Sequence, residues 1–222
     1  MATHLSDPTK ILVIFDLDFT LIDNSVAICN AFNYTAKAFQ REPFQKAQIM
    51  SKIGIPLKEM FLPFLGADDA EKAVQIFRDY YRTHFSEGLK LIPGVKGLLK
   101  QLKKIGYNLA LLTSKKTELA EQVLEYLKIK TYFPVIIGEQ KEFKPKPDPA
   151  SVKYIISRFS NIRKVFMIGD HPIDCLTAQN AGIQFIGVLT GIHSEEDFQN
   201  CMMKGLVFLK SVQWLNPALN LI

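Results

Sequence analysis

Two aspartates one residue apart, Asp16 and Asp18, follow directly on a mostly apolar run from Lys10 to Phe15. An apolar run of this kind predicts a strand that is buried on both faces, as in the middle of a parallel sheet. Side chains at the carboxyl end of such a strand lie in the crevice where open α/β sheets bind ligands. Because neighbouring carboxylates repel each other unless a cation or a shared proton relieves them, the pair indicates a site for a hard divalent ion such as Mg²⁺.

Three further predicted strands also end in polar residues. They are followed by Thr113-Ser114-Lys115 after the strand at 107–113, by Lys144-Pro145-Lys146-Pro147-Asp148-Pro149 after the strand at 135–138, and by Gly169-Asp170 with Asp174 after the strand at 164–168. The prolines of the second segment fix the backbone and can hold a lysine in one place. These strand ends are the first candidates for groups that act together with the two aspartates.

Helices and short apolar strands alternate from Ile92 onwards, in the rhythm that is typical of a parallel sheet. The predicted helices are 95–105, 117–127, 148–159, 173–181 and 195–203, and the last two strands are 184–189 and 206–209. Residues 24–91 are instead predicted to be helical throughout, with helices after a cap at Asn24 and at 45–53, 56–65 and 68–84. We therefore expect a Rossmann-like, doubly wound parallel α/β core formed by 1–23 and 92–222, with 24–91 inserted as an all-helical cap domain.

Composition excludes several classes of protein. The chain has 222 residues and is 48% hydrophobic, which is enough for a real core. It has no run of eighteen apolar residues and no apolar signal segment, so we expect a cytoplasmic protein without a membrane partner. The net charge of +5 is mild and its lysines are scattered, so no nucleic-acid partner is expected. Cys29, Cys175 and Cys201 are odd in number and far apart, which predicts reduced thiols.

In this order the motifs resemble those of the haloacid dehalogenase superfamily, in its phosphatase branch. Asp16-Leu17-Asp18-Phe19-Thr20 matches the first motif, Thr113 the second, Lys144 in a K-P-x-P segment the third, and Gly169-Asp170 with Asp174 the fourth. The family also carries a helical C1-type cap directly after the first motif, and the layout is closest to phosphoglycolate-phosphatase-like and β-phosphoglucomutase-like members. The family usually has glycine where this chain has Phe19, a departure that is expected to change the packing of the loop but not its chemistry.

The chemistry of phosphate esters explains the residue types of the first motif. A charged phosphoryl group repels nucleophiles, so a site that transfers it must cancel that charge and hold an attacking oxygen in line. Asp16 is suited to attack phosphorus and form an aspartyl phosphate. Asp18 is suited to protonate the leaving oxygen and then to deprotonate the hydrolytic water. The resemblance implies the same roles, with the backbone carbonyl of Asp18 also on the metal.

The other motifs supply the remaining groups. Thr113 and the amide of Ser114 are expected to bind the phosphoryl oxygens, and Lys144 is expected to neutralise the charge of the transition state. Asp170 completes the magnesium shell, while Asp174 binds the ion through water or orients Lys144. The predicted metal ligands are therefore Asp16, Asp18 and Asp170.

Some of these assignments have competitors in the sequence. Lys146 and Lys141 lie in the same lysine-rich loop, and the K-P-x-P register favours Lys144 over both. Asp174 is alternatively a first-turn charge that interacts with the helix dipole. His171 is either a site residue or an ordinary loop residue.

The resulting hypothesis is a Mg²⁺-dependent phosphatase that hydrolyses a small soluble phosphate monoester, phosphoglycolate-like or a sugar phosphate, through an aspartyl phosphate. A phosphomutase of the β-phosphoglucomutase type is the alternative, followed by a phosphoacceptor or binding protein without turnover. A signalling receiver domain needs neither a cap of 68 residues nor an acid at Asp18, which counts against the last reading. In the cap, Arg41, Lys52 and Lys58 either reach a substrate or lie on a solvated helix face. Monomer and homodimer both stay open.

Overall fold

A computed structural model describes residues 7–215 of the chain. The chain divides into two compact units, of which one is Ile22–Lys90 and the other comprises the described residues before and after it. The residues that follow the last predicted strand, 206–209, lie partly outside the described residues. None of the helices within 7–215 is both long and apolar enough to cross a membrane.

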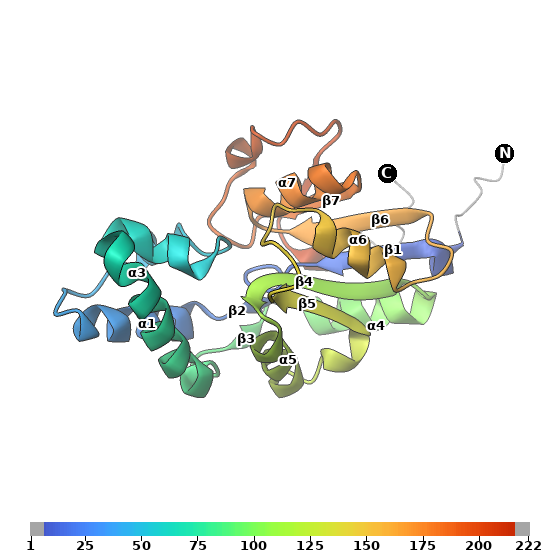
Figure 1. Cartoon of the computed structure of the whole chain (residues 1–222). Helices are drawn as coiled ribbons and strands as arrows, with labels where there is room; N and C mark the ends of the chain where they lie inside the picture. The colour runs from blue at the N-terminus through green and yellow to red at the C-terminus, as the bar shows by residue number, and fades with distance from the viewer. Residues whose placement is uncertain (1–6, 216–222) are drawn as a thin grey trace. The chain divides into compact units, whose positions relative to one another are not determined.

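The larger unit is built on a six-stranded parallel sheet with the strand order β5-β4-β1-β6-β7-β8 (Figure 1). The strands are β1 (Ile11–Phe15), β4 (Asn108–Lys116), β5 (Val135–Glu139), β6 (Lys164–Gly169), β7 (Gln184–Val188) and β8 (Val207–Leu209). All five residues of β1 are buried, because it lies at the centre of the sheet between β4 and β6. The prediction of a doubly wound parallel sheet is confirmed.

Helices cover both faces of this sheet, which explains why the central strand is apolar without alternation. Leu12 and Ile14 are buried in one core cluster with residues of α6 (Ala150–Ser157) and α7 (Pro172–Ala181). The intervening side chain of Val13 points to the opposite face, since side chains alternate along a strand. In Figure 1, α4 (Val95–Ile105) and α5 (Thr117–Tyr126) lie on the other side of the sheet from α6 and α7.

The smaller unit consists of α1 (Ser25–Ala38), α2 (Lys46–Met50) and α3 (Leu57–His84). Its core is aromatic: the ring of Phe32 lies 4.6 Å from that of Phe61 and 5.2 Å from that of Phe77, centroid to centroid. The two helices predicted at 56–65 and 68–84 form one element with a break at Gly66, whose φ of 78° is left-handed. The helical insertion after β1 was therefore predicted correctly.

The prediction that 24–91 contains no strand was wrong at its end. Lys90–Leu91 forms β3, which pairs with β2 (Ile22–Asp23) in a two-stranded sheet. The Nζ of Lys90 lies 3.2 Å from the carboxylate of Asp23. Strands of two residues have no hydrophobic periodicity, so the sequence gives no signal for them.

Asn24 precedes α1 as predicted, but its side chain does not cap the helix. Its amide donates instead to the hydroxyl of Tyr81, at 2.9 Å. The carboxylate of Asp23 accepts from the backbone N–H of Ser25 at 3.0 Å, and so takes over part of the capping.

The expectation of three reduced thiols was also wrong. Cys175 of α7 and Cys201 form a disulfide, with their Cα atoms 6.1 Å apart, and Cys29 is a free thiol. The two partners are 26 residues apart in the sequence, and only the packing of the chain after β7 against α7 brings them together. The helix predicted at 195–203 is reduced to a 3-10 turn, Glu195–Phe198, after which the chain runs to Cys201 without further helix.

Candidate active site

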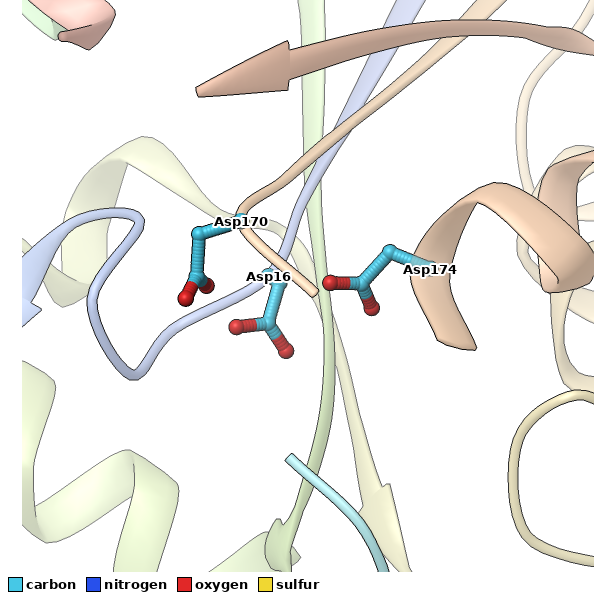
Figure 2. A group of neighbouring side chains, drawn as sticks. All are labelled: Asp16, Asp170 and Asp174. Atoms are coloured by element: carbon cyan, nitrogen blue, oxygen red, sulfur yellow. The ribbon is translucent and has the colours of Figure 1, made fainter. Parts of the chain in front are cut away.

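Three carboxylates converge at the carboxyl edge of the sheet, and together we call them the acidic cluster: Asp16, Asp170 and Asp174 (Figure 2). Asp16 follows β1, Asp170 follows the neighbouring strand β6, and Asp174 lies in the first turn of α7. The backbone N–H of Asp16 donates to the carbonyl of Ile168 at 2.9 Å, which continues the pairing of the two strands beyond their ends. Each carboxylate offers an oxygen within 4.8 Å of the others, and all three residues are buried.

A lysine is also held in the acidic cluster, but it is Lys146 and not the predicted Lys144. The Nζ of Lys146 lies 2.8 Å from Oδ1 of Asp16 and 2.6 Å from Oδ1 of Asp174, and its side chain is only 3% exposed. Lys144 and Lys141 are exposed. The dipeptide Lys-Pro occurs twice in this segment, so Lys144 and Lys146 both fit the pattern. The turn that begins at Pro145 determines which of the two lysines faces the carboxylates.

The charges of this cluster do not balance. Three carboxylates surround one ammonium, so full ionisation leaves two negative charges in a buried site. Burial, assisted by the nearby carboxylates of Asp174 and Asp18, raises the pKa of Asp16 to about 8 despite Lys146. Burial and the repulsion of the carboxylates of Asp16 and Asp174 also raise the pKa of Asp170. Burial opposes the charge of Lys146, but the attraction of Asp16 and Asp174 prevails and raises its pKa.

Asp18 lies outside the acidic cluster and contacts a different lysine. Its Oδ2 is 3.4 Å from the Nζ of Lys115, and the two side chains are 16% and 9% exposed. Lys115 was recognised from the sequence at the end of the strand that carries Thr113 but was given no role. The signal was available, since a lysine at a predicted strand end is a candidate for anion binding.

Phe19 lies in the loop after Asp16, at the position where the family usually has glycine. Phe19 adopts a left-handed backbone with φ of 57°, which favours glycine, and its ring is buried. Its carbonyl accepts a hydrogen bond from the hydroxyl of Thr190, and the hydroxyl of Thr20 donates to Oδ1 of Asp170 at 3.1 Å. These two hydrogen bonds hold the loop against the segments that follow β6 and β7.

Gly191, in the segment that follows β7, packs against the acidic cluster. A Cβ atom on Gly191 would lie 2.1 Å from Oδ2 of Asp170, so no side chain fits at this position. The backbone of the chain therefore comes into close contact with the carboxylate. An oxygen-lined cradle of this kind suits a small cation better than an organic cofactor.

Comparison with known proteins assigns this geometry to a family. Residues 13–188 match the family described as haloacid dehalogenase-like hydrolase. The chain belongs to the haloacid dehalogenase-like hydrolases. It is 32% identical over 193 residues to a phosphoglycolate phosphatase of Yersinia pestis, which covers 83% of each chain. It is also 28% identical over 185 residues to the pyrophosphatase PpaX of Bacillus velezensis, covering 83% of this chain and 85% of the relative.

Solved structures agree. A haloacid dehalogenase-like family hydrolase from Streptococcus pneumoniae superposes with a TM-score of 0.83 at 30% identity, over 93% of this chain and 97% of the other. The predicted family and the assignment as an enzyme of this hydrolase family are thereby confirmed, and relatives of the chain are phosphatases.

A metal ion fits the acidic cluster of this hydrolase. The donors are carboxylate oxygens, which hard divalent cations prefer, and a dication would cancel the two excess negative charges. Asp174, predicted as a supporting residue, is fully buried and within reach of such an ion as well as bonded to Lys146. The side chain of Asp18 lies close to Lys115. The predicted metal ligand at this residue is its backbone carbonyl, which stays a prediction.

Thr113 and Ser114 of the hydrolase lie within β4, which continues to Lys116 and so runs beyond the strand end that was predicted at 113. Thr113 is buried, and its hydroxyl oxygen accepts from the backbone N–H of Lys115 at 3.2 Å. Ser114 is half-buried beside it. The pairing of β4 with β5 is irregular between Leu112 and Lys116, so the strand end departs from simple alternation at this point.

His171 caps α7 next to the acidic cluster. Its Nδ1 accepts from the backbone N–H of Ile173 at 3.0 Å, and its ring packs edge-on against that of His193 with centroids 4.5 Å apart. Burial, which outweighs the attraction of Asp174, lowers the pKa of His171 to about 4. The imidazole is therefore neutral near pH 7 and serves to hold the first turn of α7, which carries Asp174.

Proposed function

We propose that this hydrolase is a Mg²⁺-dependent phosphatase that acts on a small soluble phosphate monoester through an aspartyl phosphate. The observation that carries the proposal is the acidic cluster with Lys146 at the carboxyl edge of the sheet. Asp16 of this cluster stands two residues before Asp18. Phosphoglycolate and pyrophosphate, which the names of two relatives specify, are the first substrates to test.

In the first half-reaction a carboxylate oxygen of Asp16 attacks phosphorus in line with the ester oxygen. The bond between phosphorus and the ester oxygen breaks, and Asp18 gives its proton to the departing oxygen. The products of this step are the free alcohol and a phosphorylated Asp16. Lys146, in the place that we predicted for Lys144, offsets the charge that gathers on the transferring group.

In the second half-reaction a water molecule attacks the same phosphorus atom. Asp18, now ionised, takes a proton from this water, and the bond between phosphorus and Asp16 breaks. Inorganic phosphate leaves and both carboxyl groups regain their starting states. The hydroxyl of Thr113 and the amide of Ser114 hold the phosphoryl oxygens through both steps.

Mg²⁺ would be held by Asp16, the backbone carbonyl of Asp18 and Asp170, with Asp174 reaching it directly or through water. When bound, the ion withdraws negative charge from the phosphoryl group and offsets the excess charge of the cluster. Thr20 and the backbone at Gly191 hold Asp170 in position for this task.

Phosphate release tests the proposal. We expect the chain to release phosphate from phosphoglycolate, pyrophosphate or a sugar phosphate with Mg²⁺ and not with EDTA, and we expect Asp16→Asn to lose this activity. Asp68→Asn, which changes an exposed carboxylate in α3, is the matched control and keeps it.

Undiminished turnover by Asp16→Asn would contradict the assignment of the nucleophile. Isomerised sugar phosphate without free phosphate would contradict hydrolysis and indicate a phosphomutase. A single phosphorylation of the protein by acetyl phosphate, with no turnover, would indicate a phosphoacceptor instead of an enzyme.

A further inference from the structure

The loop between β5 and α6 carries Lys146 in a segment where every second residue is proline. Pro145, Pro147 and Pro149 have no backbone N–H to donate. Lys146 and Pro147 are the two central residues of a turn, which the backbone N–H of Asp148 closes on the carbonyl of Pro145 at 3.0 Å. Because the prolines lack donors, the carbonyl groups of this turn are the groups by which a neighbouring element can hold it.

Asn180, in the last turn of α7, makes such a contact. Its side-chain Nδ2 donates to the carbonyl of Pro147 at 2.9 Å, directly after Lys146 in the chain. Asn180 is exposed and belongs to none of the four motifs, and no step of the proposed reaction uses it. Since a carbonyl oxygen only accepts, this contact requires a donor on the side chain at position 180.

Helix α7 therefore contacts the turn at two places. In its first turn Oδ1 of Asp174 accepts from Nζ of Lys146 at 2.6 Å, and in its last turn Asn180 holds the carbonyl of Pro147. An α-helix rises by about 9 Å over six residues. The long side chain of Lys146 thus runs from a backbone held near the end of α7 toward the carboxylate at its beginning.

The two contacts have different strengths. The ammonium of Lys146 makes charge-assisted bonds to Asp16 and Asp174, which are stronger than the neutral bond from Asn180 to a carbonyl. Losing the neutral bond therefore leaves the ammonium in the acidic cluster but frees the backbone from which its side chain reaches there. A displacement of about 1 Å is enough to lower a rate by up to about 100-fold when the displaced group acts on the transition state.

We propose that Asn180 is a positioning residue for phosphoryl transfer. By holding the carbonyl of Pro147 it fixes the turn from which Lys146 reaches Asp16. The inference rests on the proposed function, in which Lys146 offsets the charge that gathers on the transferring group. Asn180 acts on the reaction through Lys146 and through no contact of its own with the substrate.

The test measures kcat and KM for p-nitrophenyl phosphate with Mg²⁺. Asn180→Asp keeps the shape of the side chain but replaces the donor by an oxygen, and we expect it to lower kcat by about 10- to 30-fold while KM stays within about twofold. Asn180→Gln keeps an amide donor and should recover part of kcat. The matched control is Asn200→Asp, which makes the same change at an exposed position outside α7 and keeps the wild-type kcat.

A double-mutant cycle with Lys146→Met tests whether Asn180 acts through the lysine. In that background we expect Asn180→Asp to change kcat by less than about twofold, because the group that it positions is absent. The same fall in both backgrounds would overturn the inference, as would a wild-type kcat in Asn180→Asp or no recovery in Asn180→Gln, while the proposed function stands. If wild type releases no phosphate from any monoester, the proposed function itself fails. The comparison of the Asp and Gln variants needs no change at Lys146, so it decides the inference even if Lys146→Met does not fold.

Discussion

The Nζ of Lys146 lies 2.8 Å from Oδ1 of Asp16, in a pair that joins the loop after β5 to the end of the central strand. One oxygen of Asp16 is thereby engaged, and the mechanism proposed above assigns the attack on phosphorus to the other. The same ammonium reaches Asp174 at 2.6 Å, so a single positive charge orients carboxylates from two elements.

Replacing Lys146 and Lys144 one at a time should distinguish the roles of these two lysines. We expect Lys146→Met to lower kcat/KM by roughly 100- to 1000-fold, because a charge that stabilises the transition state is lost. We also expect it to lower the free energy of unfolding by about 3–5 kcal/mol at pH 8, because buried carboxylates lose their counter-charge. Lys144→Met is the matched control, since Lys144 is exposed, and it should change neither quantity. Phosphate release and urea unfolding measure the two effects. A larger loss of activity in Lys144→Met than in Lys146→Met would return the role to Lys144.

A second prediction concerns Asp18. With p-nitrophenyl phosphate, whose leaving group needs little protonation, Asp18→Asn should still transfer the phosphoryl group to Asp16. It should then fail to activate the hydrolytic water, which lowers steady-state turnover by about 100- to 10,000-fold. Rapid mixing should show a burst of p-nitrophenolate close to one equivalent, and mass spectrometry should find the phosphorylated protein. A slow reaction without a burst or phosphoprotein would contradict the two-step assignment, and Asp16→Asn, which lacks the acceptor, is the control.

The third prediction is a pH dependence of stability in the metal-free protein. The pKa of Asp16 is raised to about 8 by burial, with further contributions from Asp174 and Asp18, against an ordinary value of 3.8. Between these values the folded state binds a proton that the unfolded state has released, so the free energy of unfolding falls as pH rises. In EDTA we expect a loss of about 1–2 kcal/mol from pH 6.5 to pH 8, measured by urea unfolding.

The choice of this window follows from His171, whose effect has the opposite sign. Its pKa is lowered to about 4 from an ordinary 6.5, so the stability that it contributes is complete above pH 6.5 and is lost as pH falls toward 4. Above pH 6.5 the carboxylates alone give a slope. Asp16→Asn should remove much of that slope, and saturating Mg²⁺ should reverse it by binding the ionised form and releasing protons. A metal-free stability that is constant or rises from pH 6.5 to pH 8 would contradict the prediction.

Much of the fold follows from local sequence pattern. The continuous apolar run of β1 predicts its burial at the centre of the sheet, and the βα alternation after Ile92 predicts the parallel strands that surround it. What the pattern lacks is any signal for very short or long-range contacts. The two-residue strands β2 and β3 and the disulfide between Cys175 and Cys201 depend on packing between distant segments.

The site residues likewise fall into those that the sequence pattern identifies and those that only the structure reveals. Strand-end position and motif order identify Asp16, Asp170 and Asp174, because their geometry follows from which strands end beside each other. The choice between Lys144 and Lys146 depends on the path of a loop in which the same dipeptide occurs twice, and periodicity does not describe such a path. Lys115 was placed at a strand end by the sequence, but its contact with Asp18 joins two different strand ends and is seen only in the structure.

The last prediction concerns Phe19, where the chain departs from the glycine that is usual in the family. Two effects oppose each other here: the left-handed backbone at φ of 57° costs about 1 kcal/mol for a residue other than glycine, while the buried ring contributes about 3–5 kcal/mol. We expect Phe19→Ala to lose the ring and keep the backbone strain, and Phe19→Gly to lose the ring and relieve the strain.

Phe19→Gly should therefore be less stable than wild type but more stable than Phe19→Ala by about 1 kcal/mol in urea unfolding, the reverse of the usual order of alanine and glycine. Both variants should retain phosphate release within about tenfold of wild type, since the carbonyl of residue 19 still accepts from Thr190. Equal stability of the two variants would mean that the left-handed backbone carries no strain at this position, and a loss of activity as large as that of Asp16→Asn would mean that the ring itself takes part in the site.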